Sequence, residues 1–289
     1  MREIGEKMKK IIVTGATGGL GSVLVDQLLD AGYAVHEFSR NHCNLRAAWT
    51  FFDLRTPTIT EISDDVFAVI HCAYDFSVKN WREVCRVNVN GTLEFFRLVK
   101  QRNSPLFIFI SSMAAFDGTK SHYGQGKRKV EQVLLAQGAI CVRPGLIYGV
   151  KHGLVERIHA LIVRGGIIPL INGGKLPIYP ISATEVSEGI IKILREPKEY
   201  LGQPVILAPS RAILLRDLVN FLVPPNPHWR IYVSVPWWIM WLLVRLVEGF
   251  GIVLSFKSDS LIGLRFQNLN PFDGVLRVKD LEIKPLTES

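Results

Sequence analysis

A tyrosine and a lysine four positions apart are the residues of this chain that first indicate chemistry. Tyr123 and Lys127 stand in the stretch YGQGK, and on a helix positions i and i+4 lie on the same face. A free tyrosine has a pKa of about 10, and a neighbouring ammonium favours the phenolate and lowers that value. The pair could therefore exchange a proton near neutral pH. The same spacing also occurs on ordinary solvent-facing helices, so the surrounding elements decide its meaning.

A glycine-rich turn follows an apolar, β-branched stretch at 9–14. Gly15, Gly18 and Gly21 form the pattern G-x-x-G-x-x-G in KKIIVTGATGGLGS. The first glycine permits a tight turn, the second lets the backbone approach a pyrophosphate, and the third lets the next helix pack closely. The amides and the dipole at that helix's N-terminus favour a diphosphate. Strand, turn and helix therefore predict a dinucleotide site, with a plain βα turn as the weaker alternative.

The pattern along the chain alternates between strands and helices. We expect strands near 34–38, 50–52, 66–72, 106–111 and 139–142, and helices near 22–31, 80–102 and 123–137. This alternation is typical of an α/β fold, a Rossmann doubly wound parallel sheet. After Gly149 glycine and proline become more frequent, with helices expected near 152–163 and 184–195. We therefore expect an NAD(P)-binding domain over 1–150 and a smaller, mainly substrate-binding lobe over 151–289. Segments near 176–196 are expected to return to the Rossmann sheet.

The choice of cofactor should be decided at the end of the second strand, which reads AVHEFSRN. NAD sites usually place an acidic residue there, whereas Ser39 and Arg40 occupy this end. Because an arginine matches a 2′-phosphate through charge-assisted hydrogen bonds, we predict NADP. NAD is the alternative if Glu37 takes the ribose through a shift of two positions. Asp53, after the third strand, is expected either to accept from adenine or to cap the surface.

Composition narrows the class of protein. The chain has 289 residues, of which 48% are hydrophobic and 21% charged, and it has a net charge of +8. Its four cysteines show no close paired spacing, which argues for a cytoplasmic protein without disulfides or a metal site. We expect no signal peptide at the charged N-terminus. The positive charge suits an anionic ligand, and without a stripe of basic and aromatic residues we expect no nucleic-acid partner.

Several motifs occur together in order along residues 10–150. They read TGATGGLG, Asp53-Leu54, HCAY, NVNGT, SSMAAF, YGQGK and RPGLIYG. Together they resemble the extended (atypical) short-chain dehydrogenase/reductase family of the NAD(P)-dependent epimerase/dehydratase type. The resemblance implies nucleotide-sugar epimerases, dehydratases and reductases as relatives. It also implies a homodimer, paired through the helices near 80–102 and 123–137.

The resemblance implies a role for each matching position. Ser112 would be the catalytic serine, Tyr123 the general acid/base, and Lys127 the residue that lowers the tyrosine's pKa and binds a ribose. Asn88 would brace the central helix, and the segment from Arg143-Pro144 to Tyr148-Gly149 would shape the nicotinamide pocket. The remaining cofactor contacts would be Gly15, Thr17, Gly18, Gly19, Leu20 and Gly21 at the pyrophosphate, Ser39 and Arg40 at the 2′-phosphate, Asp53 and Leu54 at adenine, and Ala73 at a ribose.

Three departures from the family pattern lie on the substrate side. Phe116 is followed by Asp117 before a glycine, where the family has an aromatic-glycine pair. The family's later HVDD-like element reads YPISATE, and Tyr74 replaces a small residue. These changes leave the identity of the substrate open.

A tryptophan-rich tract occupies 233–256. Its longest uncharged piece, 235–244, is shorter than the roughly 20 residues that a transmembrane helix needs. A helix that is apolar nearly all round must be buried, form a contact between subunits or lobes, or lie in a membrane interface. We expect burial in the core of the second lobe, with peripheral membrane contact the weakest alternative.

These observations predict an NADP(H)-dependent oxidoreductase or epimerase. It would act on a carbonyl or secondary hydroxyl of a nucleotide-sugar-like metabolite, with Tyr123 exchanging the proton while hydride passes to or from nicotinamide. The alternatives are a non-catalytic dinucleotide sensor and an RNA-binding protein on the same fold.

Overall fold

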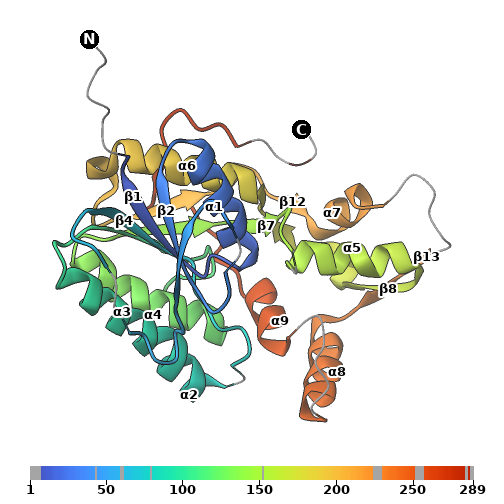
Figure 1. Ribbon diagram of the computed structural model, residues 1–289. Helices are drawn as coiled ribbons and strands as arrows, with labels where there is room; N and C mark the ends of the chain where they lie inside the picture. The colour runs from blue at the N-terminus through green and yellow to red at the C-terminus, as the bar shows by residue number, and fades with distance from the viewer. Residues whose placement is uncertain are drawn as a thin grey trace.

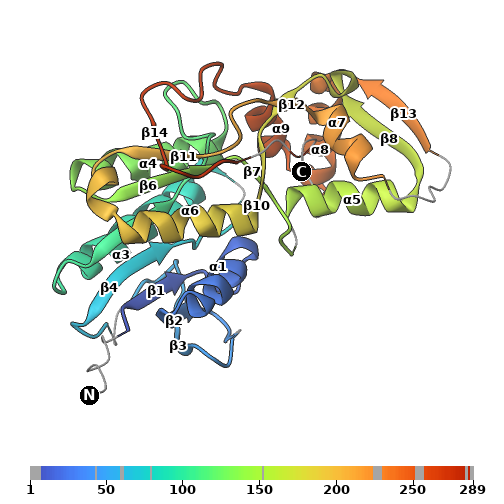
Figure 2. The same ribbon diagram turned by 90° about the horizontal axis from the view of Figure 1, so that it is seen from above.

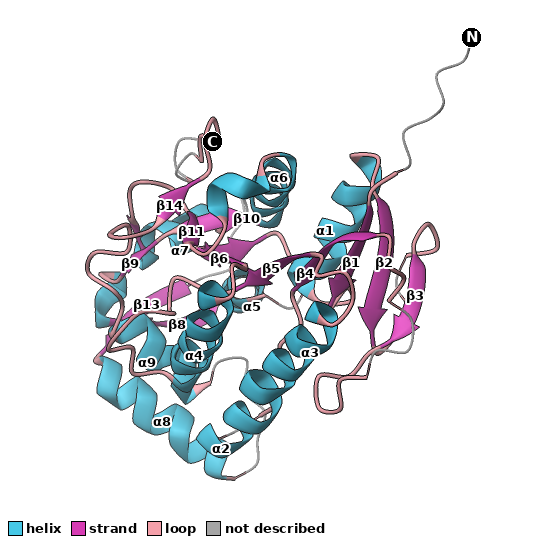
Figure 3. Cartoon of the chain, turned by 90° about the vertical axis from the view of Figure 1, so that its left-hand side faces the viewer, coloured by secondary structure: helices cyan, strands magenta, loops and turns pink. Residues whose placement is uncertain are grey.

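The structure, a computed structural model, describes residues 8–42, 44–58, 62–78, 80–151, 153–223, 230–250, 257–283 and 286. Eight strands form the central sheet of the molecule (Figure 1), in the order β14-β11-β6-β5-β4-β1-β2-β3 that Figure 3 shows. Each neighbouring pair is parallel. The strands are β1 (Lys10–Thr14), β2 (Ala34–Ser39), β3 (Ala48–Phe51), β4 (Val66–His71), β5 (Leu106–Ile110), β6 (Ile140–Pro144), β11 (Pro204–Leu207) and β14 (Leu276–Arg277).

Helices cover both faces of the sheet, which confirms the predicted doubly wound fold (Figure 2). The helices α1 (Gly19–Asp30) and α6 (Ala183–Arg195) lie on one face, and α3 (Asn90–Lys100) and α4 (His122–Ala136) lie on the other. Side chains alternate accordingly along β1, where Ile11 and Val13 join the core beside α1 and Ile12 joins the core beside α3. Because both faces are buried, the inner strands are apolar almost throughout.

The helix expected over 80–102 is interrupted by a π-helical turn. It comprises α2 (Trp81–Glu83), the π-helix η1 (Val84–Val89) and α3. Helix α4 closely approaches both η1 and the segment after β5 through two glycines. A Cβ on Gly124 would lie 2.4 Å from the carbonyl oxygen of Ala114, and one on Gly126 would lie 2.9 Å from a methyl group of Val84. Glycine lowers helix propensity, so these two positions serve close packing.

The chain after Gly149 contributes to both parts of the molecule. Strands β11 and β14 extend the central sheet, and α6 packs beside α1. Three small sheets pair β7 (Leu146–Tyr148) with β10 (Pro180–Ser182), β9 (Pro177–Ile178) with β12 (Ile213–Leu214), and β8 (Gly166–Ile171) with β13 (Arg230–Val235). The other elements are α5 (Leu154–Arg164), η2 (Asn172–Gly174), η3 (Pro197–Tyr200), α7 (Leu215–Phe221), α8 (Trp237–Gly249) and α9 (Ser258–Arg265).

The tryptophan-rich tract divides between β13 and α8, and its residues 251–256 lie outside the described part of the chain. Helix α8 buries Val244 in a cluster with Ile171 and Leu261. Its opposite face is exposed, with Trp238 at 56% and Leu246 at 53% of full exposure. The expectation of core burial is therefore wrong for that face, because α8 projects away from the central sheet (Figure 1). Within the described residues no helix combines the length and apolarity needed to span a membrane.

Candidate active site

The predicted dinucleotide site lies where the order of the strands reverses, at the carboxyl ends of β1 and β4. Crevices at such points are the usual ligand sites of open α/β sheets. Gly15 follows β1 with φ +67°, and a Cβ there would lie 2.8 Å from the Cα of Ala73, which follows β4. Only glycine allows both this left-handed conformation and this close approach.

The glycine turn folds tightly onto itself before α1. The amide of Gly18 donates to the carbonyl oxygen of Gly15 at 2.9 Å, and a Cβ on Gly21 would lie 2.2 Å from that same oxygen. Thr17 and Gly18 are exposed at the start of the helix. The first-turn amides of α1, at Gly19 and Leu20, have no acceptor within the helix. The glycine turn and these amides together fit a diphosphate.

The end of β2 presents Ser39 and Arg40, as the sequence predicts. Ser39 is buried, and its hydroxyl donates to the carbonyl oxygen of Asn41 at 2.5 Å, while Arg40 is exposed. Glu37 lies two positions earlier inside the strand, where its side chain is buried 3.7 Å from Nε2 of His42. The shift that would bring Glu37 to the strand end is not adopted.

In the segment after β3, Asp53 is partly exposed and Leu54 lies in the core. An oxygen of Asp53 accepts from the amide of Arg55 at 2.9 Å. Leu54 is buried, and its carbonyl oxygen would lie 2.2 Å from a Cβ on Gly91 of α3. Leu54 therefore fixes this segment against the helix.

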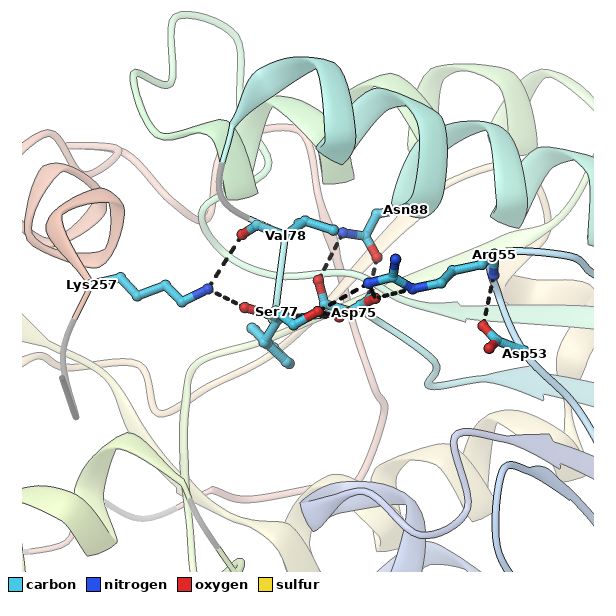
Figure 4. Close-up of polar contacts among 8 residues, drawn as sticks. Asp53, Arg55, Asp75, Ser77, Val78, Asn88 and Lys257 are labelled. Atoms are coloured by element: carbon cyan, nitrogen blue, oxygen red, sulfur yellow. Dashed lines mark hydrogen bonds and ion pairs between the residues drawn. The ribbon is translucent and has the colours of Figure 1, made fainter. Parts of the chain in front are cut away.

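The loop after β4 is held by polar contacts that the sequence did not reveal (Figure 4). The guanidinium of Arg55 donates twice to one oxygen of Asp75, at 3.0 and 2.7 Å. Burial alone would raise the pKa of Asp75, but hydrogen bonds from Ser77 and Arg55 outweigh it and lower that pKa. Asn88 both accepts from the amide of Asp75 and donates to its carbonyl oxygen, at 2.7 and 3.1 Å. Asn88 therefore joins the loop to η1.

Ser112, Tyr123 and Lys127 come together from β5 and α4. Ser112 follows β5, and its side chain favours the phenolate form of the nearby Tyr123 and so lowers that tyrosine's pKa. Lys127, one turn further along α4, is buried, and its Nζ donates to the carbonyl oxygen of Ile110 at 2.6 Å. A phenol, a hydroxyl and a buried ammonium group thus lie together at the carboxyl end of β5.

The expected lowering of the tyrosine's pKa is wrong for this arrangement. Burial raises the pKa of Tyr123, and the side chain of Ser112 offsets this only in part. The Nζ of Lys127 lies 5.9 Å from the centre of the Tyr123 ring, over its face, and is already engaged with Ile110. Burial also lowers the pKa of Lys127 to about 8. At neutral pH Tyr123 is therefore a neutral phenol.

Two aromatic rings cover this site from the loop after β4. Tyr74 packs edge-to-face on Tyr123 with ring centres 5.0 Å apart, and Phe76 stacks on Tyr123 at 6.0 Å. The Nζ of Lys127 also lies 5.0 Å from the centre of the Tyr74 ring. Tyr74, the departure from the family pattern, thus makes the surface beside the phenol aromatic.

Arg143 and Pro144, at the end of β6, make contacts that hold neighbouring parts of the fold together. Arg143 forms a buried two-point ion pair with Glu131 of α4, at 2.8 and 2.6 Å. The carbonyl oxygen of the buried Pro144 accepts from the amide of Met113 at 3.2 Å. Pro144 therefore positions the segment that carries Ser112, whereas the guanidinium of Arg143 is directed into the core.

Asp259 of α9 contacts the start of α4. Its two oxygens accept from the amides of His122 and Tyr123, at 2.7 and 3.0 Å. Figure 3 shows α9 beside α4. No local pattern marks Asp259, because its partners lie more than 130 positions earlier in the chain.

Known proteins share this sequence pattern and fold. A profile of the NAD dependent epimerase/dehydratase family matches residues 11–175, more than half of the chain. A UDP-glucose 4-epimerase from Mycoplasma pneumoniae is 28% identical over 179 residues, 56% of this chain and 50% of that protein. A sterol-4-alpha-carboxylate 3-dehydrogenase (decarboxylating) from Dictyostelium discoideum is 23% identical over 221 residues, 63% of this chain and 66% of that protein. The chain thus spans only part of the length of these relatives.

Among solved structures, a UDP-glucuronic acid 4-epimerase from Bacillus cereus in complex with NAD has the same fold. Its TM-score is 0.67 at 18% identity, and the match covers 78% of this chain and 87% of that one.

Proposed function

This chain belongs to the NAD-dependent epimerase/dehydratase family, and from that premise we propose that it is an NADP(H)-dependent oxidoreductase or epimerase whose acid/base is Tyr123. The observation that carries the proposal is that Ser112 lowers the pKa of Tyr123 through its side chain while Lys127 lies buried over the Tyr123 ring, next to the glycine turn. A bound nicotinamide dinucleotide would supply or take up the hydride.

The residues of the chain would manage the proton. The phenol of Tyr123 donates to a substrate carbonyl oxygen in reduction and accepts from a hydroxyl in the reverse direction. Ser112, beside the same phenol, donates to the substrate oxygen and fixes its orientation. A tyrosine whose pKa burial raises favours the direction in which it begins as the acid.

NADP is preferred over NAD because Arg40 is exposed at the end of β2. A guanidinium there can donate two hydrogen bonds to a 2′-phosphate. Preference for NADPH in turn favours a reductase that consumes its cofactor over an epimerase that retains it.

The substrate that we propose first is a sugar nucleotide, since similar proteins include a UDP-glucose 4-epimerase. A second candidate is an apolar ring ketone or its alcohol. The rings of Tyr74 and Phe76 against Tyr123 favour it, as does the similarity to a sterol dehydrogenase.

Turnover assays test the proposal. Purified protein is incubated with NADPH or NADH and with 4-keto sugar nucleotides or sterol ketones, while oxidation of the reduced nicotinamide is followed by absorbance. A reductase oxidises one equivalent of NADPH per product, whereas an epimerase interconverts UDP-sugars without net oxidation. If neither reaction occurs with any of these substrates, the proposed function is wrong.

Substitution Tyr123→Phe tests the role of the phenol. Loss of the proton donor should lower kcat by about 10²- to 10⁴-fold, while the affinity for NADPH, measured by fluorescence titration, stays the same. The matched control is Tyr232→Phe, which removes an exposed hydroxyl on β13. Equal turnover of the two variants would refute the assignment of Tyr123.

We also propose that the protein forms a homodimer through α3 and α4, as the family resemblance implies. Light scattering coupled to size-exclusion chromatography measures the mass directly. A mass of 32.5 kDa, that of one chain, at micromolar concentration would exclude the dimer.

A further inference from the structure

The turn that begins α9 reaches the surroundings of Tyr123 through two side chains. Asp259 accepts hydrogen bonds from the amides of His122 and Tyr123. These are among the first four amides of α4, which have no acceptor inside the helix. Ser121 satisfies another, since its hydroxyl accepts from the amide of Gly124 at 3.1 Å. The start of α4 is thus held both by its own N-cap residue and by a carboxylate from α9.

Lys257, two positions earlier, holds the aromatic loop (Figure 4). Its Nζ donates to the carbonyl oxygen of Phe76 and to that of Val78, the latter at 3.3 Å. This loop carries the rings of Tyr74 and Phe76, which pack on Tyr123. One turn of α9 therefore fixes both the backbone of Tyr123 and the rings beside its phenol.

This turn is itself anchored to α8. The carboxylate of Glu248 accepts from the amide and from the hydroxyl of Ser258, at 3.0 and 2.6 Å. Apolar contacts of Leu261 with Val244 add to the anchor. Lys257, Ser258 and Asp259 are consecutive, so a firm hold on the middle residue limits the movement of its neighbours.

We propose that Asp259 is a positioning residue for proton transfer and sets where the Tyr123 hydroxyl lies relative to Ser112. The inference rests on the proposed function of Tyr123. Ser112 is placed by β5, whereas the start of α4 is tied to α9, so the distance between the two hydroxyls depends on the carboxylate of Asp259. Small displacements matter, because a misplacement of about 1 Å can slow a reaction by about 10²-fold.

Substitution Asp259→Asn tests the proposal in the full-length protein. The amide keeps one acceptor oxygen, but its NH₂ group faces a backbone N–H that then has no acceptor. We expect kcat to fall about tenfold, with the substrate KM and the NADPH dissociation constant changed less than about twofold. Asp259→Glu keeps the carboxylate and should recover part of kcat. The matched control is Asp273→Asn, an exposed aspartate in the same C-terminal region, which should match wild type.

The assays run below the melting temperature of each variant, measured by circular dichroism. A folded Asp259→Asn variant with wild-type kcat overturns the inference, as does an equal loss in Asp259→Glu. If Asp259→Asn does not fold, the Ser258→Ala variant is measured instead, because it removes the hydrogen bond from the Ser258 hydroxyl to Glu248. We expect its kcat to fall about two- to threefold. An unchanged kcat overturns the inference. Wild-type protein without any turnover would instead refute the proposed function.

Discussion

The ammonium of Lys127 lies in a site of low polarity between α4 and the sheet. Its Nζ is 4.5 Å from the centre of the Phe109 ring and donates to the carbonyl oxygen of Ile110. These contacts compensate only part of the desolvation cost, since burial lowers the pKa of Lys127 from 10.5 to about 8. The folded state therefore binds fewer protons than the unfolded state between these values, and this group's contribution to stability rises with pH across pH 8 to 10.5.

Lys127→Met should reveal this cost as a pH-dependent difference in stability. Below pH 8 the wild type carries the buried charge and the variant does not, which favours the variant by about 3 kcal/mol. The lost hydrogen bond to Ile110 offsets part of that gain at every pH. Urea unfolding of both proteins at pH 7 and pH 10 measures the difference. If the wild type does not gain stability relative to the variant between pH 7 and pH 10, the result contradicts a lowered pKa of Lys127.

Arg40 is the residue that should discriminate between the two dinucleotides. Arg40→Ala removes charge-assisted hydrogen bonds to a 2′-phosphate, so the dissociation constant for NADPH should rise roughly ten- to a hundredfold. Binding of NADH should not change, because it lacks that phosphate. Fluorescence titration measures both constants, and Arg46→Ala, an exposed arginine paired with Asp30, is the control. Equal losses for both dinucleotides would place Arg40 elsewhere than at the 2′-phosphate.

At the scale of elements, α4 is joined to β6 by the buried pair of Glu131 and Arg143. Arg128 extends the contact, because its guanidinium lies 3.7 Å from Glu131 and donates twice to Asp117, at 2.8 Å each. The charged groups thus connect α4 with the segment that follows Ser112. Asp117, one of the departures from the family pattern, takes part in this connection.

Glu131→Gln should destabilise the protein strongly. It leaves the buried guanidinium of Arg143 without a charge partner, and such losses cost about 3–5 kcal/mol. Glu94→Gln is the matched control, since Glu94 pairs with Arg97 on the exposed surface of α3, and its removal should leave stability unchanged. Urea denaturation compares the free energies of unfolding. A small loss in Glu131→Gln would mean that Arg143 gains water or another partner.

At the scale of the whole molecule, the central sheet needs strands from the far end of the chain. Strand β11 lies between β6 and β14, and its residues Val205, Ile206 and Leu207 are almost fully buried. The glycine turn, Ser112, Tyr123 and Lys127 all precede this strand by 75 positions or more. The dinucleotide-binding part is thus not a continuous segment of the chain.

A fragment of residues 1–196 should therefore fail to fold, although it contains every motif of the predicted site. Removing β11 exposes the apolar edge of β6 and leaves an unpaired strand, which is a template for aggregation. Circular dichroism and size-exclusion chromatography of the fragment, beside the intact chain, test this. A soluble fragment with a cooperative melting transition and NADPH binding would show that β11 is dispensable.

The features that depend only on residues close together in the chain could be predicted from the amino-acid sequence. The glycine turn between β1 and α1, the spacing of Tyr123 and Lys127 and the serine after β5 are each set within one strand–helix unit, where periodicity and backbone freedom suffice. Tertiary structure alone decided which groups surround them. Burial, which depends on all neighbours at once, raised the pKa of Tyr123 where the adjacent lysine suggested a decrease. Asp259 and β11 reach the site from distant positions, and α8 leaves one apolar face exposed, because these contacts depend on how the finished elements pack.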